Sequence, residues 1–328
     1  MTDAASSFLA QLAPFRIAPE FVGRVWGYRD LRPWYARVAA SEPIGEVWLT
    51  GDQCRAQTGL CAGRTLAEIF ARHGAAMLGA GAMDSASPLL LKVIFAREKL
   101  SVQVHPDDAM ARKYGQPRGK TECWFALAAE PGAEVACGLK PGVTLDEVKA
   151  GIAAGTLEES LLMLPVDAGE MIFVDAGTVH AIWPGSILLE TQQNCDLTYR
   201  MYDYGRGREL HIEKSLEAVR LVTHAGKVAP RAAAGRTILV DAEYFRVERV
   251  AVERALDSEQ LRDADEPRPV LSYLFAAAGS ARIAGEAFEA FELPARGIVA
   301  VPASSPAFVV ENAGGLELIR IAAARPTA

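Results

Sequence analysis

Four residues in three separate stretches of the sequence carry side chains that bind metal ions. Gln103 and His105 lie two positions apart in "VQVHPDD", Glu122 lies in "GKTECWF", and His180 lies in "GTVHAIW". Zinc accepts imidazole nitrogen and carboxylate oxygen, and its catalytic sites leave one position open for water or substrate. Together the four residues offer two imidazoles, one carboxylate and one neutral amide oxygen. These residue types are therefore compatible with a zinc site, although the Q-x-H spacing is not by itself specific for one.

The neutral amide sets the charge of this predicted site. Zn²⁺ with a single carboxylate keeps a net charge of about +1, which suits a Lewis acid that polarises substrate oxygen atoms. Residue types alone leave a second interpretation open, because a histidine in a β core is commonly a hydrogen-bonded structural residue and a glutamine commonly lies at the surface. The other three histidines, His73, His211 and His224, lie on or beside predicted helices, and we expect surface or structural roles for them.

The stretch around Gln103 shows how one strand can present two ligands. Alternate side chains of a strand point to the same face, so Gln103 and His105 share one face, and Leu100, Val102 and Val104 share the other. We expect the apolar face to pack into the core and the polar face to meet the ion. The Pro-Asp-Asp sequence that follows ends the strand, and its two aspartates are expected to cap the turn, with hydrogen bonding to the metal ligands as the alternative.

The elements that position these residues are predicted from periodicity and turn signals. Apolar residues at helical spacing predict three helices, at 64–74, 144–164 and 209–220. Apolar and alternating runs predict strands at 89–105, 120–139, 166–182 and 186–206. The run at 120–139 is predicted to be a hairpin that turns at "EPGAE". The second helix is predicted to be capped by Thr144, with Glu147 three residues later, and to be broken near Gly155.

The chain is predicted to have two domains, both mostly β. Residues 1–225 contain all five histidines and are predicted to form a metal-binding catalytic β-barrel with inserted helices. An Ala-, Gly- and Pro-rich linker at 223–235 precedes residues 236–328, where short β-like runs and regular turns predict a smaller barrel or sandwich without metal ligands.

Composition and charge exclude several classes of protein. The 328 residues carry a net charge of −7 and no basic stripe, which argues against a nucleic-acid binder. The chain has no apolar stretch long enough to span a membrane and begins without the pattern of a signal peptide, so we expect a cytoplasmic protein. Its five cysteines form no C-x-x-C pair, and we expect reduced, mostly buried thiols. A monomer or a small homo-oligomer is expected.

Several stretches together resemble a type I phosphomannose isomerase in its short bacterial form. They are "PLLLKVIFAREKLSVQVHPDD", "GKTECWF", "VDAGEMIFVDAGTVHAI" and "LLETQQNCDLTYRMYDYGR", and they occur in that family's order over roughly residues 20–210. The resemblance implies a cupin fold, in which small β-barrels hold the metal inside one barrel. It also implies one Zn²⁺ per chain and interconversion of mannose 6-phosphate and fructose 6-phosphate.

The resemblance also assigns residues. It implies Gln103, His105, Glu122 and His180 as the ligands, the same four that their chemistry indicates. It further implies an active-site arginine at Arg200, with its acidic partner at Glu190, a pocket lysine at Lys92, and Lys120 beside the glutamate ligand.

Moving a proton between C2 and C1 through an enediol requires a base, and Glu190 is our candidate for it. A metal-bound water or one of the two lysines is the alternative.

The chain departs from the general cupin pattern in ways that leave some assignments open. Its first motif has Q-x-H in place of H-x-H, and Asp175 stands where a proline is usual. The phosphate contacts are not assigned, with Tyr202, Tyr204 and Arg206 as candidates, although Arg206 and Arg208 also fit a solvated surface loop. Two rival functions remain at this stage: another metal-dependent cupin enzyme, such as a different sugar isomerase or an iron oxygenase, and a non-catalytic sugar-binding cupin.

Overall fold

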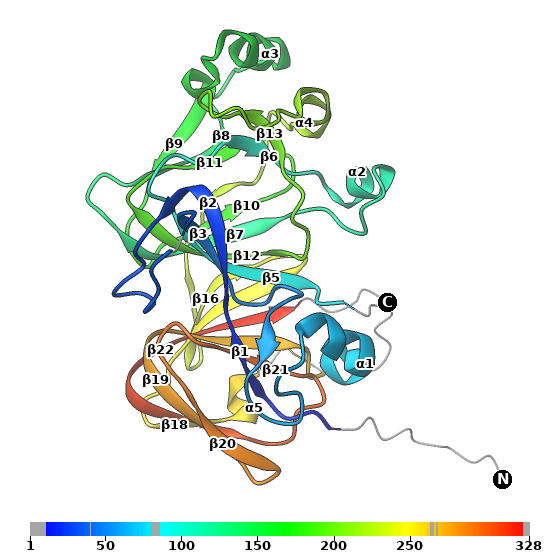
Figure 1. Ribbon diagram of the computed structural model, residues 1–328, viewed down its shortest axis with the longest axis vertical. Helices are drawn as coiled ribbons and strands as arrows, with labels where there is room; N and C mark the ends of the chain where they lie inside the picture. Colours follow the sequence, from blue (N-terminus) through cyan, green and yellow to red (C-terminus); the bar gives the residue numbers. More distant parts are fainter. Residues whose placement is uncertain (1–10, 40, 80–85, 263–265, 267, 324–328) are drawn as a thin grey trace, which may run out of the picture. The chain divides into compact units, whose positions relative to one another are not determined.

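A computed structural model describes residues 11–39, 41–79, 86–262, 266 and 268–323 of the chain. β-Strands dominate, as expected (Figure 1). The chain divides into two compact units. Unit 1 comprises Met1–Pro19, Thr50–Pro88 and Arg231–Ala328, and unit 2 comprises Glu20–Leu49 and Leu89–Pro230.

Unit 1 is built on one antiparallel sheet. Its main strand order is β15-β16-β17-β22-β19-β21-β1-β4, and β18 and β20 pair with β22 and β19. The strands are β1 (Phe15–Ala18), β4 (Arg55–Ala56), β15 (Arg231–Ala233), β16 (Arg236–Asp241), β17 (Phe245–Val250), β18 (Ala255–Asp257), β19 (Ser272–Gly285), β20 (Phe288–Leu293), β21 (Ile298–Val301) and β22 (Val309–Ala323). The helices are α1 (Leu66–Leu78) and α5 (Ser258–Leu261).

The division into units is not contiguous in the sequence, whereas a single boundary near residues 223–235 was expected. The difference arises because β1 pairs with β21, so that Phe15 lies opposite Ala300, and β4 pairs with β1. These backbone hydrogen bonds join an N-terminal part of the chain to the C-terminal sheet. Within the expected linker, Gly226–Lys227 forms a short strand, β14, on β10 of unit 2.

Unit 2 contains two antiparallel sheets. The seven-stranded sheet has the order β14-β10-β7-β12-β5-β3-β2, and the five-stranded sheet has the order β13-β6-β11-β8-β9. The first contains β2 (Glu20–Tyr28), β3 (Ile44–Trp48), β5 (Leu89–Phe95), β7 (Glu122–Ala129), β10 (Met171–Val174), β12 (Ser186–Gln193) and β14. The second contains β6 (Val102–Val104), β8 (Glu134–Leu139), β9 (Leu161–Pro165), β11 (His180–Ile182) and β13 (Tyr199–Tyr202).

The five-stranded sheet packs its outer face against helices. These are α3 (Leu145–Ala154), the 3₁₀ turn η1 (Leu157–Ser160) and α4 (Ile212–Ala218) (Figure 1). Val102 and Val104 are fully buried in this layer, in one cluster with Val148 and Ile152 of α3. Gln103 of the same strand and His105, the residue directly after the strand, point to the opposite side, so the predicted alternation is confirmed for these four residues.

Leu100 does not follow the predicted alternation. It packs with Trp124 and Ile94 in the core between the sheets, on the side opposite Val102 and Val104. The physical reason is that the strand begins only at Val102, so Leu100 lies outside the regular pleat.

The predicted hairpin at 120–139 is wrong. β7 pairs with β10 and β12, whereas β8 pairs with β9 and β11, so the chain crosses from one sheet to the other at the "EPGAE" turn. The two strands were correctly predicted, but pairing depends on partners that lie far away in the sequence. The crossing places Glu122, at the start of β7, on the sheet that faces His105 and His180.

The helix predictions are confirmed in part. Thr144 and Glu147 form the expected capping box of α3, which ends at Gly155 in the left-handed conformation. Residues 161–164, predicted as helix, belong to strand β9 instead, where they pair with β8. α1 continues past the expected stop at Gly74 to Leu78, with a kink at His73.

A short helix, α2 (Asp108–Lys113), was not predicted. The predicted capping role of Asp107 is confirmed, because its side chain accepts a hydrogen bond from the backbone N–H of Met110 at 2.9 Å. Asp108 accepts from the backbone N–H of Gly119 at 2.8 Å instead.

Candidate functional site

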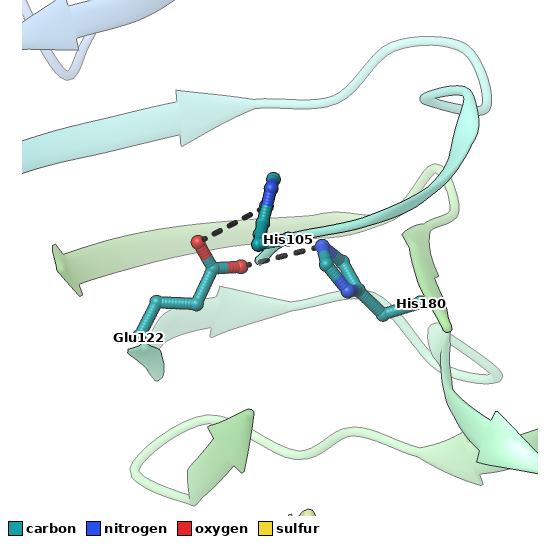
Figure 2. Close-up of side chains that lie close together, drawn as sticks. All are labelled: His105, Glu122 and His180. Carbon is teal, nitrogen blue, oxygen red and sulfur yellow. Dashed lines mark ion pairs between the residues drawn. The ribbon is translucent and has the colours of Figure 1, made fainter. Parts of the chain in front are cut away.

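Three buried residues of unit 2 converge on one point. Glu122 Oε2 lies 3.6 Å from His105 Nε2, and Glu122 Oε1 lies 3.5 Å from His180 Nε2 (Figure 2). One ligand atom from each residue lies within 4.8 Å of the other two. At least 99% of the surface of each residue is buried. Two imidazoles and a carboxylate at these separations can bind one metal ion.

The strands explain why these residues meet. His180, the first residue of β11, lies directly opposite Gln103 of β6 in the sheet register. His105 follows Gln103 by two positions and therefore points to the same side of the strand. The carboxylate comes from the other sheet, where Glu122 opens β7 opposite Gln192 and Val174. The cluster thus lies between the two sheets of unit 2.

Unpaired polar atoms show that the cluster fits a metal ion. His105 Nε2 and Glu122 Oε1 are buried and have no hydrogen-bond partner among the described residues, an arrangement that costs free energy unless a cation binds them. His180 Nδ1 lies 2.9 Å from the carbonyl oxygen of Thr178, so that Nδ1 carries the proton and Nε2 is free to bind an ion.

Gln103 lies at the edge of this cluster. Its Nε2 lies 3.2 Å from His180 Nε2, and its Oε1 accepts from the hydroxyl of Ser101 at 3.3 Å. The amide oxygen, which is the ligating atom, faces the cluster after a 180° rotation of the amide plane. Oxygen and nitrogen of an amide exchange places readily in this way. The position therefore fits the fourth ligand predicted from the sequence.

Both imidazoles are held in the neutral, ligating form. Burial, followed by the charge of Lys120, lowers the pKa of His105 well below its usual range. Burial lowers the pKa of His180 to about 4.

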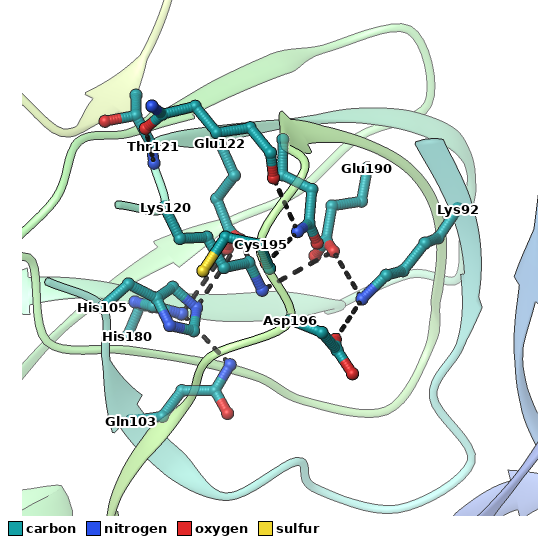
Figure 3. A network of polar contacts seen from close by, with 12 residues as sticks. Lys92, Gln103, His105, Lys120, Thr121, Glu122, His180, Glu190, Cys195 and Asp196 are labelled. Carbon is teal, nitrogen blue, oxygen red and sulfur yellow. Dashed lines mark hydrogen bonds and ion pairs between the residues drawn. The ribbon is translucent and has the colours of Figure 1, made fainter. Parts of the chain in front are cut away.

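A network of buried charges continues from the metal cluster (Figure 3). Lys120 Nζ lies 3.1 Å from Glu122 Oε2 and 3.9 Å from Glu190 Oε1, and Lys92 Nζ lies 3.7 Å from the same Glu190 oxygen. Trp124 Nε1 donates to Glu190 Oε2 at 3.2 Å. Burial, followed by the charge of Glu122, raises the pKa of Glu190. Three of the four catalytic residues expected from the sequence, Lys92, Lys120 and Glu190, lie in this network.

The pairing of strands brings the residues of this network together. Glu190 of β12 lies opposite Lys92 of β5 on one side and Trp124 of β7 on the other. Lys120 is brought in by the loop before β7, where its backbone N–H donates to the carbonyl of Pro106 at 3.0 Å. Gly119 allows this approach, because a Cβ atom there would lie 2.5 Å from the Pro106 oxygen.

Sequence reasoning missed two carboxylates of the network. Asp196 Oδ1 accepts from Lys92 Nζ at 3.0 Å, and Glu46 Oε2 lies 3.9 Å from the same nitrogen. Glu46 also forms a two-point ion pair with Arg24, at 3.0 and 2.9 Å. The available signal was Glu46 in the apolar run "IGEVWL", because a buried carboxylate needs a cation.

A pocket of about 500 Å³ opens beside the metal cluster. Five of the residues predicted for the site line it, namely Lys92, Gln103, Lys120, Glu190 and Arg200. Arg200 of β13 lies opposite Gln103 of β6, on the side away from His180. Arg208 and Arg24 also line the pocket, whereas Tyr202, Tyr204 and Arg206 do not.

The fold and this site define a class of protein: a mostly β protein in which two histidines and a glutamate that can bind a metal ion lie beside a polar pocket. A family model described as "Phosphomannose isomerase type I, catalytic domain" matches residues 15–140. The chain is 34% identical to the mannose-6-phosphate isomerase of Streptococcus mutans over 264 residues, which cover 75% of this chain and 81% of that protein. The chain belongs to the type I phosphomannose isomerase family.

Solved structures agree with this assignment. The mannose 6-phosphate isomerase of Bacillus subtilis superposes with a TM-score of 0.82 at 28% identity, covering 94% of this chain and 99% of that chain. A mannose 6-phosphate isomerase bound with zinc and yttrium superposes with a TM-score of 0.73 at 16% identity, covering 95% of this chain, and at this identity it shows the fold alone. The family and the cupin-type fold expected from the sequence are therefore confirmed.

Two further expectations can be compared with the structure. All five cysteines are buried free thiols, as predicted. Among the described residues, no helix has both the length and the apolar character that crossing a membrane requires.

Proposed function

We propose that this chain is a zinc-dependent isomerase that interconverts mannose 6-phosphate and fructose 6-phosphate through an enediol. The observation that carries the proposal is the position of the His105–Glu122–His180 cluster beside a pocket that also holds a buried carboxylate and an arginine. An aldose–ketose isomerase needs these three functions: a Lewis acid, a base and a stabiliser of developing charge. The name of the 34% identical Streptococcus mutans relative supports the choice of substrate.

The metal would be held by His105, Glu122 and His180, with Gln103 as the fourth ligand. When bound, zinc would supply Lewis acidity at the sugar's carbonyl oxygen. Nitrogen ligands, one carboxylate and a neutral oxygen donor are a set that zinc accepts.

Glu190 is the proposed base. It would take the proton from C2 of the aldose to form the enediol and return it to C1 to give the ketose, while one hydroxyl proton moves from O2 to O1. Its burial favours the proton-accepting role, because a carboxylate with a raised pKa is a stronger base. Lys92 and Lys120 fit this role less well, since each lies beside carboxylates that stabilise its charged form.

Arg200 is proposed to stabilise negative charge that develops on the sugar oxygens. Its guanidinium lines the pocket, and none of the described carboxylates lies within ion-pair distance of it, so its charge is available to the substrate. Lys92 and Lys120 are proposed to hold sugar hydroxyls at the base of the pocket and to orient C1 and C2 toward Glu190.

A coupled assay that follows fructose 6-phosphate formation from mannose 6-phosphate tests the proposal. Chelation should abolish turnover, and added Zn²⁺ should restore it in proportion to the bound metal measured by elemental analysis. Turnover by fully demetallated protein would remove the metal from the mechanism. A restored protein that binds zinc but leaves mannose 6-phosphate unchanged would refute the assigned reaction.

A further inference from the structure

The loop after β13 carries two arginines, Arg206 and Arg208, that both pair with Asp203, but only Arg208 lines the pocket. Tyr204, Gly205 and Gly207 all have positive φ angles, of 55°, 74° and 74°. Arg206 turns toward the protein, where its Nη2 donates to the carbonyl of Lys99 at 2.8 Å. Arg208 lines the pocket instead. Because residues other than glycine rarely adopt a left-handed backbone, the positive φ angle of Tyr204 indicates a well-defined loop conformation.

Asp203 holds the Arg208 guanidinium in a fixed position. Arg208 Nε donates to Asp203 Oδ2 at 2.8 Å, and Nη2 donates to Oδ1 at 2.5 Å. The Asp203 side chain is almost fully buried, so this two-point contact is sheltered from water. The third nitrogen, Nη1, has no hydrogen-bond partner among the described residues. Arg208 therefore offers the pocket a charged donor whose orientation is fixed.

A second guanidinium makes this wall of the pocket strongly positive. Arg200 is close enough to Arg208 that, after burial, the neighbouring charge is the main cause of its lowered pKa. The Arg200 Nε atom is buried without a hydrogen-bond partner among the described residues. Arg24, also in the pocket, differs because all three of its nitrogens donate, two to Glu46 and one to the carbonyl of Gly23.

We propose that Arg208, positioned by Asp203, binds the phosphate group of the sugar substrate. This inference rests on the proposed function, because it takes the substrate to be a hexose 6-phosphate. The phosphate is a dianion at the end of the sugar opposite C1 and C2, so it needs a cation set apart from the metal cluster. Arg208 meets this need because its Nη1 is a free donor whose direction is fixed by the contact with Asp203. Asp203 is shared by Arg206 and Arg208, so the three side chains together keep a positive charge, whereas all three nitrogens of Arg24 already donate within the protein.

Two variants and a control test the assignment. Arg208→Gln should raise KM for mannose 6-phosphate by roughly 10- to 100-fold with little change in kcat, the scale of lost charged hydrogen bonds. It should also weaken the binding of inorganic phosphate, measured by titration calorimetry, to a similar degree. Arg208→Lys should give an intermediate loss, because one ammonium cannot contact both Asp203 and the ligand in a forked geometry. Arg112→Gln, an equal charge change on the exposed face of α2, should leave both quantities unchanged.

The two readouts separate this proposal from the proposed function. Unchanged KM and unchanged phosphate affinity in Arg208→Gln, in protein with wild-type melting temperature and zinc content, would overturn it. A loss of kcat at constant KM would also overturn it, since that result would place Arg208 at the reacting carbons. If the wild type does not isomerise mannose 6-phosphate, the proposed function fails, while the calorimetric comparison still reports whether Arg208 binds phosphate.

Discussion

Glu190→Gln is the sharpest test of the proposed mechanism because it removes the proposed base while keeping the shape of the side chain. Glutamine has the same shape as glutamate, and its amide oxygen can still accept the hydrogen bond from Trp124 Nε1. The two lysines that face Glu190, at 3.7 and 3.9 Å, each lose an attraction of about 4 kcal/mol at an effective dielectric constant of about 20. Lys92 keeps Asp196 at 3.0 Å, and Lys120 keeps Glu122 at 3.1 Å. Both lysines therefore remain protonated.

The expected effect on turnover follows from the loss of proton transfer. Removing a general base lowers kcat by roughly 10²- to 10⁴-fold, which corresponds to about 3 to 5 kcal/mol of barrier height. KM should change by less than this, because the phosphate and the metal site are untouched. Bound zinc should stay at the wild-type level, since Glu190 is not in the proposed ligand set. The coupled assay gives kcat and KM, and elemental analysis gives the metal content.

Glu46→Gln is the matched control for this variant. Glu46 is also a buried carboxylate of the pocket, and it lies 3.9 Å from Lys92, but it does not contact Lys120 within ion-pair distance. Losing its charge should lower kcat by less than about tenfold if proton transfer is what matters at Glu190. A Glu190→Gln enzyme that keeps more than a tenth of wild-type kcat, or a Glu46→Gln enzyme with an equal loss, would refute Glu190 as the base.

Three further predictions concern the same site. Arg200→Ala should lower kcat by about 10²-fold, the scale of one preorganised charge stabiliser, and a near-normal kcat in the coupled assay would contradict its role. Gln103→Glu should retain zinc but lower kcat, because a second carboxylate weakens the Lewis acid, and metal analysis with kinetics checks both. The metal-free protein should lose stability as the pH falls from about 6.5 toward about 4, by about 3 kcal/mol for His180 alone. Stability falls with pH because the unfolded chain binds the proton on His180 at a higher pH than the folded protein does. Urea unfolding at both pH values measures the loss, with His180→Gln as the comparison.

Local sequence patterns were sufficient to predict which side chains of a strand share a face. Val102 and Val104 pack under α3, and Gln103 and His105 face the other side, because the alternation of a strand depends only on adjacent residues. The same reasoning failed for Leu100, which lies before the strand begins. The face that a side chain takes was thus predictable within the strand and at the residue directly after it, but not at Leu100, two positions before the strand.

Strand pairing was not predictable in this way. A turn between two β-like runs suggested a hairpin at 120–139, yet β7 and β8 belong to different sheets. Asp196 and Glu46 were missed for the same reason, since they reach Lys92 from segments 104 and 46 positions away in the sequence. Pairings of this kind depend on the whole fold, and composition or periodicity within a segment carries no information about them.

The division of the site between two sheets has a chemical consequence. The five-stranded sheet supplies the amide and His180, whereas the seven-stranded sheet supplies both Glu122 and Glu190. Two buried carboxylates that lie close together cannot both stay ionised without a shared cation. Lys120 is that cation, because its Nζ lies 3.1 Å from one and 3.9 Å from the other. A metal ion at Glu122 would leave more of the Lys120 charge to Glu190, so loading the metal site and setting the basicity of Glu190 are parts of one electrostatic arrangement.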